Sequence, residues 1–238
     1  MSILSGIHPI AEALKAGRPL ERLMIARGAG GPRLQEIIEL ARKASVPVRF
    51  EPRNALDRVA GSAAHQGVVA FGGQTQYADL DAALGCNLVV VLDGVEDPHN
   101  LGAVIRTAHA AGAGALVIPE RRATGITDVA AKAAAGALEH LPVVRVTNVN
   151  RALEELKRQG FWIYGLDERG TECYDQVDFG KPTVLVFGGE GNGLHELVRK
   201  HCDALVRIPM AGKISSLNVS VSAGVVLFEW KRRFGGAT

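Results

Sequence analysis

Three loops of the sequence concentrate glycine, amide, hydroxyl and carboxylate groups, which can bind and orient a small polar ligand. They are DGVEDPHNLGAVIR at residues 93–106, FGGEGNGL at 187–194 and IPMAGKISSLNVSVSAG at 208–224. Each loop leaves an apolar run typical of a buried strand and leads into a helical stretch. Since ligands of a parallel sheet bind beyond the carboxyl ends of its strands, these loops are the predicted site.

The first loop carries an amide and a guanidinium at a predicted helix start. Asn100 is a natural N-cap, and capping alone would explain it. Arg106 follows six residues later, nearly two helical turns from the cap. Its long side chain either reaches toward the strand ends or points into water.

The second loop crowds four glycines between a strand and a helix: Gly188, Gly189, Gly191 and Gly193. Glycines at this density let the backbone approach a ligand closely or adopt positive φ. The alternative is a plain tight turn capped by Glu190 and Asn192.

The third loop enters a helix whose first turn carries Ser216, Asn218 and Ser220. These groups could serve only as caps. Ser220 and Ser222, however, are predicted to lie one to two turns inside the helix, where serine gives no helix stability. We therefore expect Ser220 and Ser222 to have another function or to make a close packing contact.

Other chemistries find no support in the sequence. It has neither a G-x-S-x-G nucleophile elbow nor a phosphate loop, and DGVEDP stands where an oxidoreductase would carry its dinucleotide fingerprint. The spacing within 195–203, which holds His195, His201, Cys202 and Asp203, matches no zinc pattern, so no metal is expected. His99 and His109 are interpreted as exposed or structural, and Cys86, Cys173 and Cys202 as reduced structural thiols.

The elements that must position these loops form an α/β pattern. Strands are predicted at 88–92, 115–118, 143–146, 162–166, 183–187 and 204–208. Helices are predicted at 101–111, 128–135, 149–159, 194–201 and 217–233. Strands alternating with helices predict a mainly parallel sheet covered on both faces.

The first residues form a separate small α/β unit. Helices are predicted at 9–16, beginning at His8-Pro9, and at 33–44, with strands at 22–26, 46–50 and 67–71. Glycines and polar residues at 72–76 are typical of a linker. We therefore expect a first domain at 1–73, a linker at 74–82 and a second domain at 83–238.

Charge divides along the same boundary. Residues 1–73 hold 10 Lys+Arg against 6 Asp+Glu, and residues 74–238 hold 17 against 19. Eight of the ten are arginine, whose planar fork suits phosphate; candidates for RNA contact are Arg18, Arg22, Arg33, Arg49 and Arg53. A solvated basic face is the alternative. Lacking a membrane-span or signal-peptide pattern, the chain is expected in the cytoplasm.

Taken together, NLGAVIR at 100–106, FGGEGNGL at 187–194 and IPMAGKISSLNVSVSAG at 208–224 resemble the three ordered motifs of the SpoU (TrmH-type) RNA methyltransferases. GIHPIAEAL at 6–14 and HQGVVA at 65–70 are similar to the substrate-binding domain of the bacterial 23S rRNA guanosine-2′-O-methyltransferases, which resembles a small ribosomal RNA-binding protein. The resemblance covers both predicted domains.

This resemblance implies a fold, a cofactor and an activity. It implies a C-terminal α/β trefoil-knot domain and a homodimer with the site near the subunit interface. The implied reaction is the methylation of a ribose 2′-hydroxyl without a metal. The implied target is a guanosine of 23S rRNA. S-adenosylmethionine would lie against Gly188, Gly189, Ile208, Met210 and Leu217. The polar active-site positions would be Asn100, Arg106, Glu190, Ser216 and Asn218. A tRNA ribose methyltransferase of the same family and a non-catalytic RNA-binding protein are the alternatives.

Overall fold

The protein consists of two compact units in a computed structural model that describes residues 2–72, 76–180, 182–191, 193–213 and 215–234. Unit 1 comprises residues 1–76 and 126–140, and unit 2 comprises residues 77–125 and 141–238. The predicted boundary at 72–76 falls partly on residues 73–75, which lie outside the described residues.

Unit 1 contains a four-stranded sheet in the order β1-β4-β2-β3. The strands are β1 (Ser2–Ser5), β2 (Leu20–Ala26), β3 (Val48–Glu51) and β4 (Val68–Gly72). β4 pairs antiparallel with β1 and β2, whereas β3 is parallel to β2. β3 therefore forms one edge of the sheet, with its carboxyl end beside that of β2.

Helices cover both faces of this sheet. One apolar cluster joins it to α1 (Ile7–Lys15) and α2 (Pro32–Lys43), and a second joins it to α3 (Arg53–Ala60). The segment 126–140 adds α5 (Asp128–Ala134) and the 3-10 helix η2 (Ala137–Glu139). Its Glu139 accepts a hydrogen bond of 2.8 Å from Arg18 with both side chains largely buried.

Three elements of unit 1, β1, α3 and η2, were not predicted from the sequence, and α1 begins earlier than predicted. β1 is too short to give a readable alternation, and α3 has Leu56 as its only fully buried residue, so its apolar periodicity is weak. Helix α1 begins at Ile7 rather than at Pro9, because Gly6 occupies the cap position.

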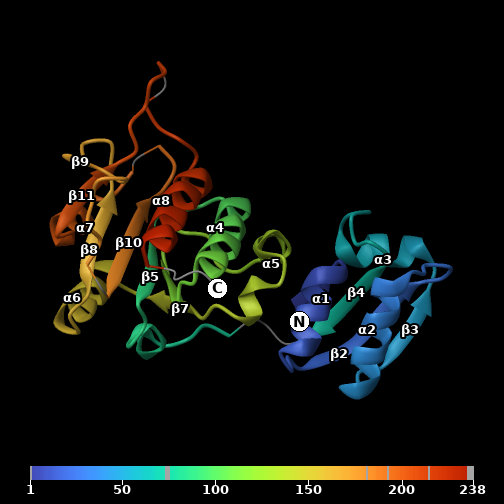
Figure 1. Ribbon diagram of the computed structural model, residues 1–238. Helices are drawn as coiled ribbons and strands as arrows, with labels where there is room; N and C mark the ends of the chain where they lie inside the picture. Colours follow the sequence, from blue (N-terminus) through green and yellow to red (C-terminus); the bar gives the residue numbers. More distant parts are fainter. Residues whose placement is uncertain (1, 73–75, 181, 192, 214, 235–238) are drawn as a thin grey trace. The chain divides into compact units, whose positions relative to one another are not determined.

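Unit 2 is built on a seven-stranded sheet in the order β7-β6-β5-β10-β8-β11-β9 (Figure 1). Its strands are β5 (Leu88–Asp93), β6 (Ala115–Pro119), β7 (Val143–Val146), β8 (Trp162–Leu166), β9 (Glu172–Cys173), β10 (Thr183–Gly188) and β11 (Ala204–Arg207). All pairings between them are parallel, which confirms the predicted sheet.

Helices cover both faces of the parallel sheet. An apolar cluster packs η1 (Leu80–Ala83), α6 (Val149–Arg158) and α7 (Glu196–His201) onto one face. On the other face α4 (Pro98–Ala111) and α8 (Val219–Phe234) lie side by side (Figure 1). The buried Trp230 of α8 donates a hydrogen bond of 2.9 Å to Thr183 of β10.

The start of α4 differs from its prediction. Asp97 caps this helix by accepting a hydrogen bond of 2.8 Å from the backbone nitrogen of His99, so the helix begins at Pro98 and Asn100 is not its cap. Pro98, which follows Asp97, occupies the first position of the helix, where its missing N–H would have no partner within the helix.

The start of α8 also differs. This helix begins at Val219, which places Ser220 in its first turn rather than deeper inside. Among the described residues, no helix is both long and apolar enough to traverse a lipid bilayer.

Candidate functional site

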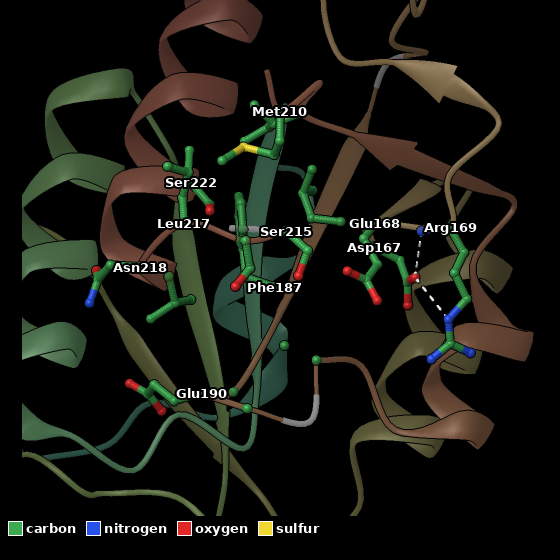
Figure 2. A pocket seen from close by; sticks show the side chains of 18 of the residues that line it. Asp167, Glu168, Arg169, Phe187, Glu190, Met210, Ser215, Leu217, Asn218 and Ser222 are labelled. Carbon is green, nitrogen blue, oxygen red and sulfur yellow. Dashed lines mark hydrogen bonds and ion pairs between the residues drawn. The ribbon is translucent and has the colours of Figure 1, made fainter. Parts of the chain in front are cut away.

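The predicted loops meet at the carboxyl ends of four neighbouring strands, β5, β10, β8 and β11. The ends of β8, β10 and β11 and the segments that follow them enclose a pocket of about 510 Å³ (Figure 2). This volume lies within the range of small-molecule sites. The carboxyl edge of the parallel sheet therefore holds the candidate site, as the sequence predicts.

Backbone packing, rather than ligand contact, explains two of the loop glycines. A Cβ on Gly188 would lie 2.1 Å from the carbonyl carbon of Gly193, and one on Gly189 would lie 2.0 Å from the oxygen of Gly94. Gly191 and Gly193 have φ of 83° and 62°, which only glycine adopts readily. The loop is thus a tight turn that folds back on β10 and lines the pocket with backbone.

A chain of hydrogen bonds joins the three loops. The Asn100 amide nitrogen donates to Glu190 Oε1 at 2.6 Å, and its amide oxygen accepts from Asn218 Nδ2 at 3.1 Å. Asn218 Oδ1 in turn accepts from the backbone nitrogen and the hydroxyl of Ser220, at 2.9 and 2.6 Å. The predicted residues Asn100, Glu190 and Asn218 therefore form one polar network.

A second contact anchors the glycine loop to β5. The buried carboxylate of Asp93 accepts hydrogen bonds from the backbone nitrogen of His195 at 2.8 Å and from its Nδ1 at 2.9 Å. Beside this pair lies a cavity of about 500 Å³ that shares Gly189, Glu190 and Gly193 with the main pocket. Glu190 therefore lies between the main pocket and this second cavity.

Most predicted site residues line the main pocket. They are Gly188, Gly189, Glu190, Ile208, Met210, Ser216, Leu217 and Asn218. Asn100 reaches the site only through its hydrogen bonds with Glu190 and Asn218. Arg106 is exposed on α4, outside the pocket wall, and makes no hydrogen bond or ion pair with the described residues.

The sequence reasoning missed an acidic wall of the pocket. Figure 2 shows Asp167, Glu168 and Arg169 across the pocket from Glu190 and Asn218. Asp167 pairs with Arg199 at 3.0 Å and accepts from the Arg169 backbone nitrogen at 2.9 Å. Glu168 is exposed and makes no ion pair with the described residues. The signal was available, since residues 167–169 directly follow the predicted strand 162–166.

Metal and thiol chemistry gain no support from this geometry. Among the described residues, no group of three His, Cys, Asp or Glu side chains could hold a metal ion. Burial raises the pKa of the Cys202 thiol to about 12, so it stays protonated and unreactive at neutral pH.

Family models match both halves of the chain. The SpoU rRNA Methylase family matches residues 87–228, and the RNA 2′-O ribose methyltransferase substrate binding family matches residues 3–78. The chain is 44% identical over 235 residues to YacO of Bacillus subtilis strain 168, described as a TrmH family tRNA/rRNA methyltransferase. That similarity covers 96% of this chain and 94% of YacO.

Solved structures of methyltransferases are similar to this protein over nearly the whole chain. The SpoU methyltransferase AviRb from Streptomyces viridochromogenes, in complex with the cofactor AdoMet, has a TM-score of 0.84 at 29% identity, covering 98% of this chain and 91% of AviRb. The AdoMet-bound rRNA methyltransferase from Sinorhizobium meliloti has a TM-score of 0.80 at 27% identity, covering 98% and 87%. From its sequence, its parallel sheet and these matches, the chain belongs to the SpoU family of RNA methyltransferases.

Proposed function

We propose that this protein transfers a methyl group from S-adenosylmethionine to a ribose 2′-hydroxyl of RNA, with a guanosine of 23S rRNA as the target. The observation that carries the proposal is the hydrogen-bonded network of Asn100, Glu190 and Asn218. It brings the three predicted loops together at the edge of a pocket of cofactor size.

The pocket suits the cofactor by its volume and by the chemistry of its lining residues. Leu166, Ile208, Met210 and Leu217 supply apolar surface, and the glycines of the loop after β10 supply backbone. Glu168 offers a carboxylate that can accept hydrogen bonds from ribose hydroxyls or from an α-ammonium group. When bound, the cofactor supplies an electrophilic methyl group, so the protein needs only to position the reactants and manage a proton.

The second cavity is suited to the target nucleotide, because it adjoins the main pocket through Glu190. Both Glu190 oxygens are engaged, Oε1 by Asn100 and Oε2 by the backbone nitrogen of Glu96 at 3.4 Å. We assign Glu190, Asn100, Asn218 and Ser216 the task of orienting the ribose for in-line attack. A hydroxyl held in this orientation has already lost the freedom of movement that would otherwise add to the activation barrier.

Arg106 is assigned to the RNA rather than to the cofactor. Its side chain is exposed and lies outside the cofactor pocket. A guanidinium keeps its proton, so Arg106 holds the target phosphate and stabilises the developing alkoxide, while solvent or a phosphate oxygen accepts the proton.

We further propose that the protein is a homodimer with a trefoil knot at its C-terminal end. The exposed apolar side chains Leu217, Val221 and Phe228 lie on or beside α8 and suit a contact with a second copy. The knot is supported by the order of the sheet, where β10 lies between β5 and β8, and by the return of α8 to the side of α4.

The rRNA methyltransferase among the solved structures, whose likeness covers 98% of this chain, favours rRNA over tRNA. The test is to map 2′-O-methylation in rRNA and tRNA from cells with and without the protein. One rRNA guanosine that loses its methyl group supports the proposal. A lost tRNA methyl group would assign the tRNA activity, and unchanged maps would assign a non-catalytic role.

A further inference from the structure

The basic side chains of unit 1 are mostly left without carboxylate partners. Of the ten Lys and Arg in residues 1–76, only Lys15 and Arg18 form ion pairs with carboxylates among the described residues. The other eight are Arg22, Arg27, Arg33, Arg42, Lys43, Arg49, Arg53 and Arg58. Arg18 and Arg22 are the weakest of the predicted RNA contacts, since Arg18 pairs with Glu139 and Arg22 lies 4.1 Å above the Phe71 ring.

One aromatic ring lies exposed among these cations. Phe50 is 53% exposed on the edge strand β3. Val48, two residues earlier and on the same face, packs against the core cluster that contains Ile25 and Ile37. The core therefore ends before Phe50, and about half of this residue stays exposed in the described part of the chain.

Two arginines follow the ends of β2 and β3, close to Phe50 in the fold or the chain, because these strands are parallel and end together. Arg27 follows β2, and its Nε donates to the Phe50 carbonyl oxygen at 3.3 Å. Arg53 follows β3 as the first residue of α3, and both arginines are exposed. Glu51, the acidic neighbour of Phe50, points to the opposite face of the strand.

We infer that the Phe50 surface, defined as Arg27, Phe50 and Arg53, binds a single-stranded segment of the RNA substrate by stacking one unpaired base on the Phe50 ring. Aromatic rings between cations bind single strands in this way, with the arginines on the adjoining phosphates. Bases within a duplex are already stacked and leave no face for Phe50. The inference rests on the proposed RNA methyltransferase function and narrows its substrate to RNA with a looped-out base.

The experiment uses the full chain and two RNA probes. One is a single-stranded oligoribonucleotide containing 2-aminopurine, whose fluorescence falls when it stacks, and the other is its duplex. Phe50→Ala should abolish the quenching and weaken single-strand binding by about 5- to 100-fold, while Phe50→Tyr retains both. Trp162→Ala is the matched control, because Trp162 is 51% exposed but belongs to unit 2.

The contribution of the arginine charges is tested separately from that of the Phe50 ring. Arg53→Gln should reduce the slope of log affinity against log salt by about 0.7, the value for one single-strand phosphate contact. Arg158→Gln is the control, since Arg158 pairs with Glu155 within α6 and its loss should leave the slope unchanged.

Each other outcome overturns the inference in a recognisable way. If the intact protein methylates RNA and Phe50→Ala binds and quenches like the unaltered chain, the surface is wrong and the proposed function stands. If Phe50→Ala changes the sedimentation of the protein without changing RNA binding, the ring belongs to a protein contact. If the intact protein neither binds nor methylates RNA, both proposals fail together.

Discussion

Asn100 and Glu190 lie 90 residues apart in the sequence and are joined by a hydrogen bond of 2.6 Å from Nδ2 to Oε1. The same Asn100 amide accepts from Asn218, so one side chain connects the helix after β5, the turn after β10 and the start of α8. Because Asn100 is buried at 8% exposure, these bonds have little competition from water. The network fixes the position of Glu190 relative to the pocket.

Replacing Asn100 with alanine should therefore damage both stability and activity. The change removes the hydrogen bonds that Asn100 makes with Glu190 Oε1 and Asn218 Nδ2, and one such bond contributes about 0.5–1.5 kcal/mol to stability. Urea denaturation should show that loss, and methyl transfer should fall. Asn54→Ala, an exposed asparagine in α3, is the control. Unchanged unfolding and unchanged turnover in Asn100→Ala would remove the network from the mechanism.

The sheet of unit 2 was predictable because its strands are nearly continuous apolar runs. Residues Leu88–Asp93 and Thr183–Gly188 are buried along almost their whole length, which only a sheet covered on both faces provides. The meeting of Asn100, Glu190 and Asn218 was predictable for a related reason: loops after such strands must converge.

Other features could not be read from the sequence because they depend on tertiary contacts. Asp97 and Asn100 are both good cap residues, and only the fold shows that one caps while the other bonds to Glu190. The ion pair between Asp167 and Arg199 joins the segment after β8 to α7, which only the fold brings together. The pairing of Arg18 with Glu139 joins residues 121 positions apart.

Arg106→Ala should leave S-adenosylmethionine affinity within about twofold while reducing methyl transfer by about 100-fold or more, as for the loss of one donor to a developing oxyanion. The reason is that Arg106 lies outside the cofactor pocket. Calorimetry gives the affinity and a tritium-transfer assay gives the rate. Arg151→Ala, on the exposed side of α6, is the control. A large loss of cofactor affinity with normal turnover would contradict the assignment.

Cofactor binding should be independent of divalent metal. The pocket offers backbone, apolar side chains and separate carboxylates, and the described residues contain no cluster that could hold an ion. Titration calorimetry with S-adenosylmethionine should give the same affinity in excess chelator as in excess Mg²⁺. An affinity that disappears with chelator and returns with added metal would refute this expectation.

The homodimer should depend on the exposed apolar side chains of α8. Val221 and Phe228 are 51% and 48% exposed and lie seven residues apart, on one face of the helix. Phe228→Asp should shift the protein to a monomer in sedimentation at micromolar concentration, because burying a carboxylate in that contact is unfavourable. Leu197→Asp, a substitution at an equally apolar and 61% exposed position on α7, should leave the dimer intact. A monomeric unaltered protein would contradict the proposal.

The C-terminal end of α8 should lose stability in acid through Glu229. Hydrogen bonds from Arg232 and Arg233 lower the pKa of this carboxyl from 4.5 to about 2. Arg233 also donates to the carbonyl oxygen of Val177 at 2.6 Å, so Glu229 helps to hold the helix against the segment that follows β9.

A carboxyl whose pKa is lower in the folded than in the unfolded state contributes stability above the unfolded value, near pH 4.5, and loses it as the pH falls through about 2. Glu229→Gln should therefore unfold at lower urea than the unaltered chain at pH 7, and the two should converge between pH 4.5 and 2. Glu39 is exposed on α2 and serves as the control. Glu39→Gln should unfold at the same urea concentration as the unaltered chain at pH 7, so there is no difference that could disappear in acid. If the gap between Glu229→Gln and the unaltered chain stays constant down to pH 2, the ion pairs are not its cause.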